Sequence, residues 1–225
     1  MQEAIRIIST KILLSNQKQY LLNAGFSVIE SDFIKTEDLD FSTKILHDSL
    51  IFTSQNAVHS VLKHPDLKIL QQKEVFCVGL KTKALLEANG FNVIAYTGYA
   101  ADLAEIITLV YPKRTYTFFS GNLRRDTLPD TFQEAGIVFN EITVYTTSLT
   151  PHKIEAKANG LLFYSPSGVV SYLKDNPITD EICFCIGTTT AEALLNVTKN
   201  IVIANQPTIE NTIIQCLNHF KSLAS

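Results

Sequence analysis

The sequence contains no tryptophan, one methionine and only four cysteines among its 225 residues. It also lacks an excess of charge of either sign, since 19 lysines and arginines stand against 22 aspartates and glutamates, for a formal net charge of −3. This balance provides no broad positive field for binding nucleic acid, so we expect no such partner. Disorder is excluded, because 46% of the residues are apolar and supply a core. An acidic ligand would have to be bound locally.

The cysteines form neither a disulfide framework nor a zinc motif. Cys77, Cys183, Cys185 and Cys216 are irregularly spaced, and no Cys-x-x-Cys pair accompanies them. Cys183 and Cys185 alternate within the apolar run 182–186, which predicts a buried strand with both thiols on one face. We therefore expect buried free thiols and no metal site.

Segments that would direct the chain to a membrane are also missing. No apolar run approaches the ~18 residues of a membrane span, and no signal-peptide pattern precedes the first predicted strand. We expect a soluble, cytoplasmic protein with no membrane partner.

Several catalytic motifs are absent as well. The sequence contains neither the Gly-x-x-x-x-Gly-Lys-Ser/Thr phosphate loop nor a Gly-x-Gly-x-x-Gly dinucleotide motif after the first strand. No Ser/His/Asp set or carboxylate pair falls in the loops after predicted strands. The histidines are expected on the surface, away from the strand ends: His47, His59, His64, His152 and His219.

The two halves of the chain resemble each other at an offset of 111 residues. Segments 50–62 and 161–173 share six identical residues at matching positions, and both have the pattern of an apolar strand, a turn containing serine, and a helix. Ser9 aligns with Ser120, and the offset drifts to 107 further along without breaking the order of the matches. We infer that the chain consists of two related halves.

Strand and helix patterns alternate within each half. Helical spacing of apolar residues separates the strands, as at Val58, Val61 and Leu62. Nearly all-apolar strands that alternate with helices favour a parallel sheet covered on both faces, so we expect two five-stranded, doubly wound α/β domains. The predicted strands are 5–8, 27–30, 50–53, 75–79, 92–96, 116–120, 138–147, 160–164, 182–187 and 200–204.

Two extended segments, 27–35 and 138–147, are longer than a five-residue core strand and occupy matching places in the two halves. They have the length of crossovers between domains. If they are crossovers, the middle of the chain forms one domain and both ends form the other. The periodicity alone leaves this arrangement and two contiguous domains open.

Small hydroxyl residues and glycines follow six of the predicted strands, where parallel sheets bind ligands. One interpretation is that they cap helices; the other is that their hydroxyls and the nearby amides bind anionic groups. Six such turns favour a polyanionic ligand, and a reaction there would depend on positioning and hydrogen bonding, with tyrosine as a candidate acid. These turns are 9–11, 53–56, 79–82, 120–122, 164–168 and 187–190.

Taken together, the segments at these places resemble the uroporphyrinogen-III synthase family. Each motif is weak alone, but their order and spacing are specific, and the resemblance extends from about residue 5 to residue 220. The segments that carry it are 51–58, 78–82, 118–126, 143–146, 163–168 and 186–191.

The resemblance implies two flavodoxin-like, doubly wound parallel-sheet domains joined by a two-stranded β linker, with the active site in the inter-domain cleft. Residues 1–33 plus 149–225 would form a discontinuous first domain, and 38–143 the second. The linker strands would be 30–38 and 141–149. The resemblance thus implies that the two extended segments cross between domains, so that the middle of the chain forms one domain and both ends form the other.

The resemblance also implies a cofactor-free lyase of haem and tetrapyrrole biosynthesis, which we expect to be a monomer. Such an enzyme closes the linear tetrapyrrole hydroxymethylbilane into uroporphyrinogen III, loses water, and inverts ring D through a spiro intermediate. The substrate is a polycarboxylate. Amides, hydroxyls and a few bases, such as Lys11, Arg124 and Arg125, would suit it despite the net negative charge.

Tyr145 corresponds to the tyrosine of the family's Val-Tyr-x-Thr motif, which is implied to protonate or orient the departing hydroxyl. A phenol with a pKa of ~10 is protonated at neutral pH and can donate a proton. The residue pattern alone favours an ordinary half-buried strand tyrosine. Two positions depart from the family, since Gln55 stands where many relatives have proline and Lys11 where arginine is frequent. The implied substrate contacts are Ser9, Lys11, Thr53, Ser54, Thr82, Ser120, Gly121, Ser165, Ser167, Gly168, Thr189 and Thr190.

One other function remains open from the residues, and a further one is disfavoured. A non-catalytic two-domain protein could bind a small anion as a sensor, since fold does not fix function. A degenerate synthase retained for regulation would need an attached DNA-binding module, for which the two halves leave no residues.

Overall fold

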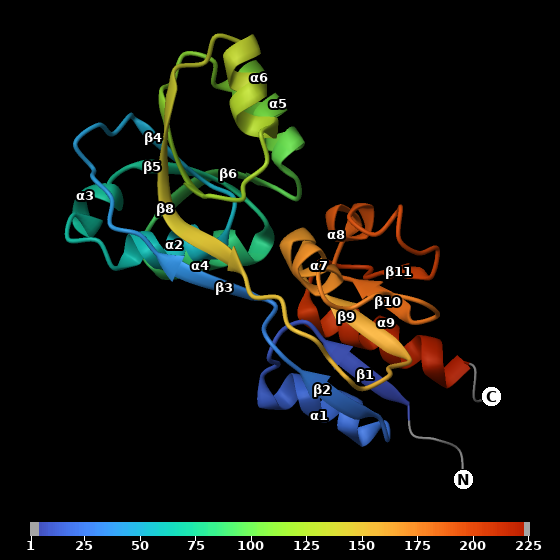
Figure 1. The fold of residues 1–225 in the computed structure, drawn as a ribbon. Coiled ribbons are helices and arrows are strands. Elements are labelled where there is room, and N and C mark those ends of the chain that lie inside the picture. Colours follow the sequence, from blue (N-terminus) through green and yellow to red (C-terminus); the bar gives the residue numbers. More distant parts are fainter. Residues whose placement is uncertain (1–4, 223–225) are drawn as a thin grey trace. The chain divides into compact units, whose positions relative to one another are not determined.

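The computed structural model describes residues 5–222, which form two compact units of parallel β-sheet and helices (Figure 1). One unit combines the described residues up to Lys35 with those from Ser148 onward. The other spans Thr36–Thr147. We call them the terminal unit and the central unit.

The terminal unit contains a five-stranded sheet in the order β11-β10-β9-β1-β2, in which every neighbouring pair is parallel. Its strands are β1 (Arg6–Ser9), β2 (Ser27–Glu30), β9 (Gly160–Phe163), β10 (Ile182–Cys185) and β11 (Ile201–Ile203). Its helices are α1 (Ser15–Asn23), α7 (Pro166–Leu173), α8 (Thr188–Glu192) and α9 (Ile209–Ser222).

Helices cover both faces of this sheet because successive strand residues point to opposite sides. Ile7 packs in a buried cluster with Leu21 of α1 and Phe220 of α9. Its neighbour Ile8 packs in a different cluster with Val169 of α7. In Figure 1, α7 and α8 accordingly lie on one side of the strands and α1 and α9 on the other.

The central unit contains a six-stranded sheet in the order β3-β8-β7-β4-β5-β6, in which β4 to β8 are parallel. Leu50 faces the cluster of α2 and α4, whereas Ile51 faces that of α5 and α6. Its strands, of which the first and last each extend two residues beyond the unit, are β3 (Ile34–Asp38), β4 (Ser49–Phe52), β5 (Glu74–Val78), β6 (Asn92–Thr97), β7 (Tyr116–Gly121) and β8 (Phe139–Leu149). Its helices are α2 (Gln55–Leu62), α3 (Leu67–Leu70), α4 (Leu80–Ala88), α5 (Ala100–Val110) and α6 (Thr127–Glu134).

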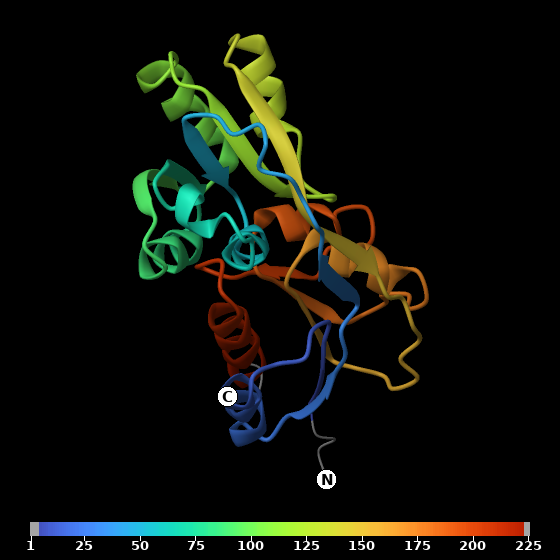
Figure 2. The same cartoon turned by 90° about the vertical axis from the view of Figure 1, so that its left-hand side faces the viewer.

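All ten predicted strands are present with ends within two residues of those expected, and both sheets are built from parallel strands as predicted. The prediction of two five-stranded sheets is wrong for the central unit, where β3 adds an edge strand beside β8 (Figure 2). The expected continuous segment 27–35 is also wrong, because β2 ends at Glu30 and β3 begins at Ile34. Between them Phe33 is fully buried in the terminal unit, so the chain turns inward there.

The internal repeat is visible in the topology. Strands β4, β5, β6, β7 and β8 occupy the same order in their sheet as β9, β10, β11, β1 and β2 do in the other. The matching segments 50–62 and 161–173 form β4–α2 and β9–α7. Numbered along the chain within each unit, the parallel strands of the terminal unit have the order 2-1-3-4-5, and those of the central unit 3-2-1-4-5.

The cysteines behave as predicted. All four are free and buried, and Cys183 and Cys185 lie in one apolar cluster. Burial raises the pKa of each of these two thiols to about 12. Both thiols therefore stay protonated at neutral pH.

Of the histidines expected on the surface, only His59 is exposed, and the other four are half-buried. His152 stacks on Phe33 with ring centroids 4.1 Å apart, and its Nε2 is buried without a hydrogen-bond partner among residues 5–222. His64 is half-buried and stacks on Phe41, while its Nδ1 accepts a hydrogen bond from the Asp66 amide at 3.1 Å. Both rings fill apolar gaps beside a core.

Candidate functional site

All predicted site residues except Tyr145, which lies within β8, are found at or just after the carboxyl ends of strands. Since the strands concerned are parallel, these loops gather at one edge of each sheet. The terminal unit contributes Ser9, Lys11, Ser165, Ser167, Gly168, Thr189 and Thr190, and the central unit Thr53, Ser54, Thr82, Ser120, Gly121 and Tyr145.

Two repeat-related serines cap helices. Ser54 Oγ accepts a hydrogen bond from the Ala57 amide at 3.3 Å at the start of α2. Ser165 Oγ accepts one from the Gly168 amide at 3.0 Å at the start of α7, and lies 3.1 Å from Ser167 Oγ. The capping interpretation is confirmed for these two serines. Both remain half-buried rather than enclosed.

Ser9 ends β1 inside the terminal unit and is fully buried. Its hydroxyl donates to the Lys11 carbonyl at 2.5 Å and lies 3.4 Å from the Tyr164 phenol oxygen, while the Lys11 side chain is exposed. Burial raises the pKa of Tyr164 more than its hydrogen bond with Ser9 lowers it, so this phenol is protonated. The sequence analysis did not name Tyr164 as a site residue, although its position directly after β9 could have pointed to it.

The remaining terminal-unit residues surround the starts of α7 and α8. A Cβ on Gly168 would lie 3.3 Å from Ser165 Oγ and 3.7 Å from Thr10 Oγ1, so these loops pack closely. Thr189 is half-buried. The Thr190 hydroxyl is buried and has no hydrogen-bond partner among the described residues. It is therefore a polar group that a ligand or water could satisfy.

In the central unit, Thr53 follows β4 and is half-buried, whereas Thr82 is buried in the first turn of α4. The turn before α4 depends on Gly79, whose φ of +91° lies in the region that favours glycine. A Cβ there would lie 3.6 Å from Thr82 Oγ1. The backbone and the hydroxyl thus approach each other closely at the end of β5.

Tyr145 lies directly over Gly121. The two residues are cross-strand partners at a β-bulge between Ser120 and Gly121, where β7 and β8 change register. A Cβ on Gly121 would lie 2.3 Å from Tyr145 Cζ and 2.7 Å from its phenol oxygen, so no side chain fits there. The structure therefore brings together Ser120, Gly121 and Tyr145, and Tyr145 stays half-buried at the edge of the core.

Glu141, which the sequence analysis did not select, binds both Ser120 and Arg124 at this edge. Its Oε1 accepts hydrogen bonds from Ser120 Oγ at 2.5 Å and from Arg124 Nε at 2.6 Å, and its Oε2 accepts one from Arg124 Nη2 at 2.7 Å. Burial alone would raise the pKa of Glu141, but the hydrogen bonds from Arg124 and Ser120 hold it below its ordinary value. The internal repeat could have pointed to Glu141, because it aligns this residue with Glu30. Glu30 is also in an ion pair, with its Oε1 3.1 Å from Lys18 Nζ.

Arg124, one of the bases that the resemblance implies for the substrate carboxylates, is paired with carboxylates of this chain. Its guanidinium is bound bidentately by Glu141 and also contacts Asp126. The hydrogen bond to Glu141 raises the pKa of Arg124, so the guanidinium stays charged. The other two predicted bases, Lys11 and Arg125, have exposed side chains in strand-end loops.

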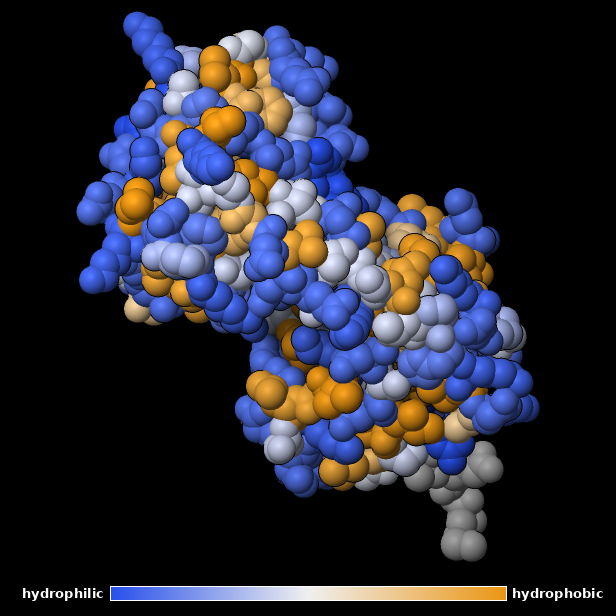
Figure 3. Space-filling view, turned by 60° about the vertical axis from the view of Figure 1, so that its left-hand side comes forward, coloured by the Kyte–Doolittle hydropathy of each residue, from blue (hydrophilic) through white to orange (hydrophobic). Residues whose placement is uncertain are grey.

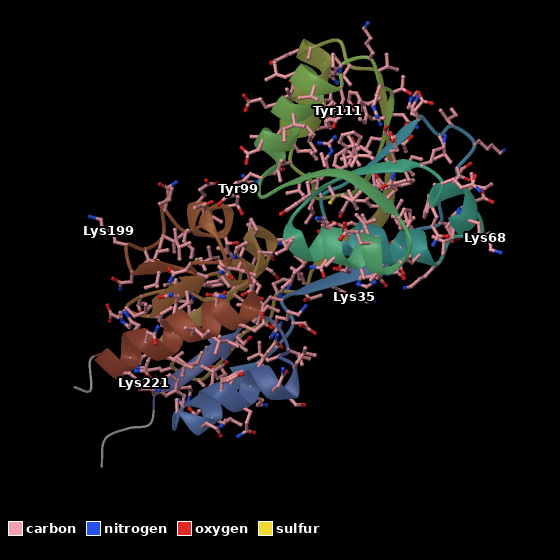
Figure 4. The ribbon with its side chains drawn as sticks, turned by 180° about the vertical axis from the view of Figure 1, so that it is seen from behind. Lys35, Lys68, Tyr99, Tyr111, Lys199 and Lys221 are labelled. Carbon is pink, nitrogen blue, oxygen red and sulfur yellow. The ribbon has the colours of Figure 1, made fainter. Side chains whose placement is uncertain are left out.

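Apolar side chains are exposed beside these polar groups. Ile12, Leu80 and Leu123 follow β1, β5 and β7 and are 55%, 65% and 55% exposed. Tyr99 is exposed in the loop between β6 and α5 (Figure 4). Figure 3 shows apolar residues interspersed with hydrophilic ones on the face in view. The strand-end loops thus offer both hydroxyls and apolar contact surface.

A half-open cavity of about 390 Å³ lies elsewhere in the central unit. It is lined by residues of 38–41 and 60–65, among them Asp38, which is bound by Ser60 and Lys63. None of the predicted site residues lines it.

Two kinds of feature are absent from the described part of the chain. Within residues 5–222, no group of three or more His, Cys, Asp or Glu side chains could hold a metal ion. No helix in that range has both the length and the apolar character needed to cross a bilayer.

Comparisons with known proteins agree with one another. The family model described as uroporphyrinogen-III synthase HemD matches residues 15–214. The uroporphyrinogen-III synthase of Chlorobaculum parvum is 32% identical over 168 residues, which cover 64% of this chain and 68% of that protein.

Two solved structures share the fold. A crystal structure of uroporphyrinogen-III synthetase from Helicobacter pylori matches with a TM-score of 0.72 and 21% identity, over 96% of this chain and 99% of that one. A mutant uroporphyrinogen III synthase from Thermus thermophilus matches with a TM-score of 0.71 and 14% identity, over 98% and 100%. With the family model covering most of the sequence, the chain belongs to the uroporphyrinogen-III synthase family.

Proposed function

We propose that this protein cyclises hydroxymethylbilane to uroporphyrinogen III, with inversion of ring D and loss of water, in tetrapyrrole biosynthesis. The observation that carries the proposal is the match of the synthase family model to residues 15–214. The match favours an enzyme over the anion-binding sensor that the sequence alone leaves open. The loops at the strand ends support the same substrate, because hydroxyls and helix N-termini suit a polycarboxylate.

The proposal extends to the division of the chain into domains. Residues 1–33 with 149–225 and residues 38–143 form two flavodoxin-like domains, joined by linker strands 30–38 and 141–149; residues 1–4 and 223–225 lie outside the described part. The strand order 2-1-3-4-5 supports this for the terminal unit, since it is the flavodoxin-like order, whereas the order 3-2-1-4-5 of the central unit differs from it. Both domains contribute strand-end loops to substrate binding.

Within the site, Tyr145 acts as the proton donor or orienting group for the departing hydroxyl. Its half-buried position over Gly121 supports this role, because the ring is held in place beside the end of β7 while part of it remains accessible. The capping serines and the unpaired Thr190 hydroxyl bind substrate carboxylates or ring nitrogens. Lys11 supplies a positive charge from the loop after β1.

Much of the catalysis is control of substrate conformation, since the bilane also closes without an enzyme to the type I isomer. Holding the two ends of the bilane in one geometry selects which carbon of ring D attacks. The enzyme works as a monomer in the cytoplasm, in keeping with the sequence expectation.

The test is incubation of the purified protein with hydroxymethylbilane, followed by oxidation and chromatographic separation of the uroporphyrin isomers. We expect the type III isomer, formed faster than the type I isomer in an enzyme-free control. A product that contains only type I would contradict the proposal. Tight binding of a sugar or organic acid together with that result would favour the sensor function instead.

A further inference from the structure

The loop after β7 is attached to β8 on both sides of Tyr145. Before Tyr145 in the chain, Glu141 holds Ser120 and Arg124 through the three hydrogen bonds described above. After it, the Asn122 side chain accepts a hydrogen bond from the Thr147 amide at 2.7 Å and donates one to the Thr147 carbonyl at 3.3 Å. The side chains of Glu141 and Asn122 thus attach residues 120–124 to the strand that carries Tyr145.

The backbone of the loop also contacts Tyr145 directly. The Asn122 amide donates to the Tyr145 carbonyl at 3.3 Å, and Gly121 is its cross-strand partner. The Arg124 amide in turn donates to the Gly121 carbonyl at 3.2 Å, which closes the turn. Any movement of this turn relative to β8 therefore moves the surface on which the Tyr145 ring rests.

The Tyr145 ring and the turn at Gly121 are in direct contact, with no free space between them. A Cβ on Gly121 would meet three atoms of the ring at 2.3–2.7 Å, so the ring packs directly on the glycine backbone. The turn lies at a β-bulge, a feature that re-aims side chains beside active sites.

The ion pair is better suited to fixing geometry than to adding stability. The side chains of Arg124 and Glu141 are 26% and 23% exposed, so both charges lose hydration when they pair. Partly buried pairs of this kind are weak contributors to net stability, but bidentate geometry fixes orientation. Loss of one partner would leave the other free to move the turn.

We propose that Glu141 and Asn122 are positioning residues, which attach the turn 120–124 to β8 and thereby fix the Tyr145 phenol for the reaction. The inference rests on the proposed function, and in particular on the role of Tyr145. It assigns Arg124 to this arrangement rather than to the substrate carboxylates. A residue that acts through Tyr145 changes kcat, whereas a residue that binds a substrate carboxylate changes KM.

The experiment measures kcat and KM for type III formation in Glu141→Gln and Asn122→Ala, each alone and combined with Tyr145→Phe. The matched control is Glu74→Gln, which disrupts another Arg–Glu pair of the central unit, with Arg114, at the amino ends of the strands. Asn122→Ala changes a side chain on an exposed turn, and so provides a second test if Glu141→Gln does not fold. Thermal unfolding of each variant shows which are folded.

We expect Glu141→Gln to lower kcat by about tenfold or more, because small displacements of a catalytic group are costly, with KM unchanged within about twofold. In the Tyr145→Phe background the same substitution should lower kcat by less than about twofold, since coupled residues are non-additive. Glu74→Gln should match the wild type. Three results would overturn the inference. The first is a wild-type kcat in folded Glu141→Gln and Asn122→Ala, and the second is an equal loss of kcat with and without the Tyr145 phenol. The third is a change in KM alone. Failure of the wild type to form type III would instead refute the proposed function.

Discussion

Substitution of Gly121 by alanine should displace the Tyr145 ring by about 1 Å. A Cβ at this position would lie 2.3 Å from Tyr145 Cζ, and ordinary contact begins at 3.4 Å, so the ring must move by about 1.1 Å, the difference between the two distances. The glycine backbone cannot yield easily, because it is paired with β8 on one side and continues into the closed turn on the other.

A displacement of this size at a catalytic group costs on the order of a hundredfold in rate. Overpacking should lower the free energy of unfolding by only about 1–3 kcal/mol, so the protein should remain folded. The assay is the initial rate of type III formation, with circular dichroism to confirm the fold. The matched control is Gly98→Ala, because a Cβ there meets no atom within 4 Å. A folded Gly121→Ala variant with wild-type activity would refute the assignment of Tyr145.

Three further predictions follow from the same structure. Tyr145→Phe should keep the fold but form type III at least tenfold more slowly, and undiminished turnover would remove the phenol from the mechanism. Ser165→Ala should lower the free energy of unfolding by about 1 kcal/mol in urea titrations, because α7 loses its cap; an unchanged midpoint would contradict this. Folding lowers the pKa of Glu141 below its ordinary value of 4.5, so the ionised carboxylate stabilises the folded protein at pH values above 4.5. This contribution is lost as the pH falls below 4.5 and the carboxylate becomes protonated. The stability difference between wild type and Glu141→Gln should therefore shrink between pH 7 and pH 3 in unfolding titrations, and a difference that grows on acidification would contradict the ion pair.

The regular strands could be predicted because their residues are buried on both faces. Leu50, Ile51 and Phe52 are all fully buried, and such continuous apolar runs are readable without any structure. The strand β3 had no such signal, since four of its five residues are exposed at the edge of the sheet. Phe33 looked like part of an extended crossover, whereas its ring is buried against His152 and Tyr172 in the terminal unit.

The sequence predicted which candidate residues lie at strand ends and helix starts, but not the contacts that they make. Serines at the starts of two helices follow from capping preferences and from the repeat, and both caps are present. The attachment of Arg124 to Glu141 depends on two side chains that are 17 residues apart in the chain and meet only when β7 pairs with β8. Sequence patterns give the charge of such residues, but not whether a neighbouring strand neutralises it.

The isomer composition of the product, measured as a function of the wild-type protein's concentration, tests the central claim most directly. If the chain cyclises hydroxymethylbilane as proposed, the type III fraction should rise with protein concentration until type I nearly disappears, and heat-denatured protein should have no effect. A type III fraction that stays at the enzyme-free level at every concentration of folded protein would contradict the account.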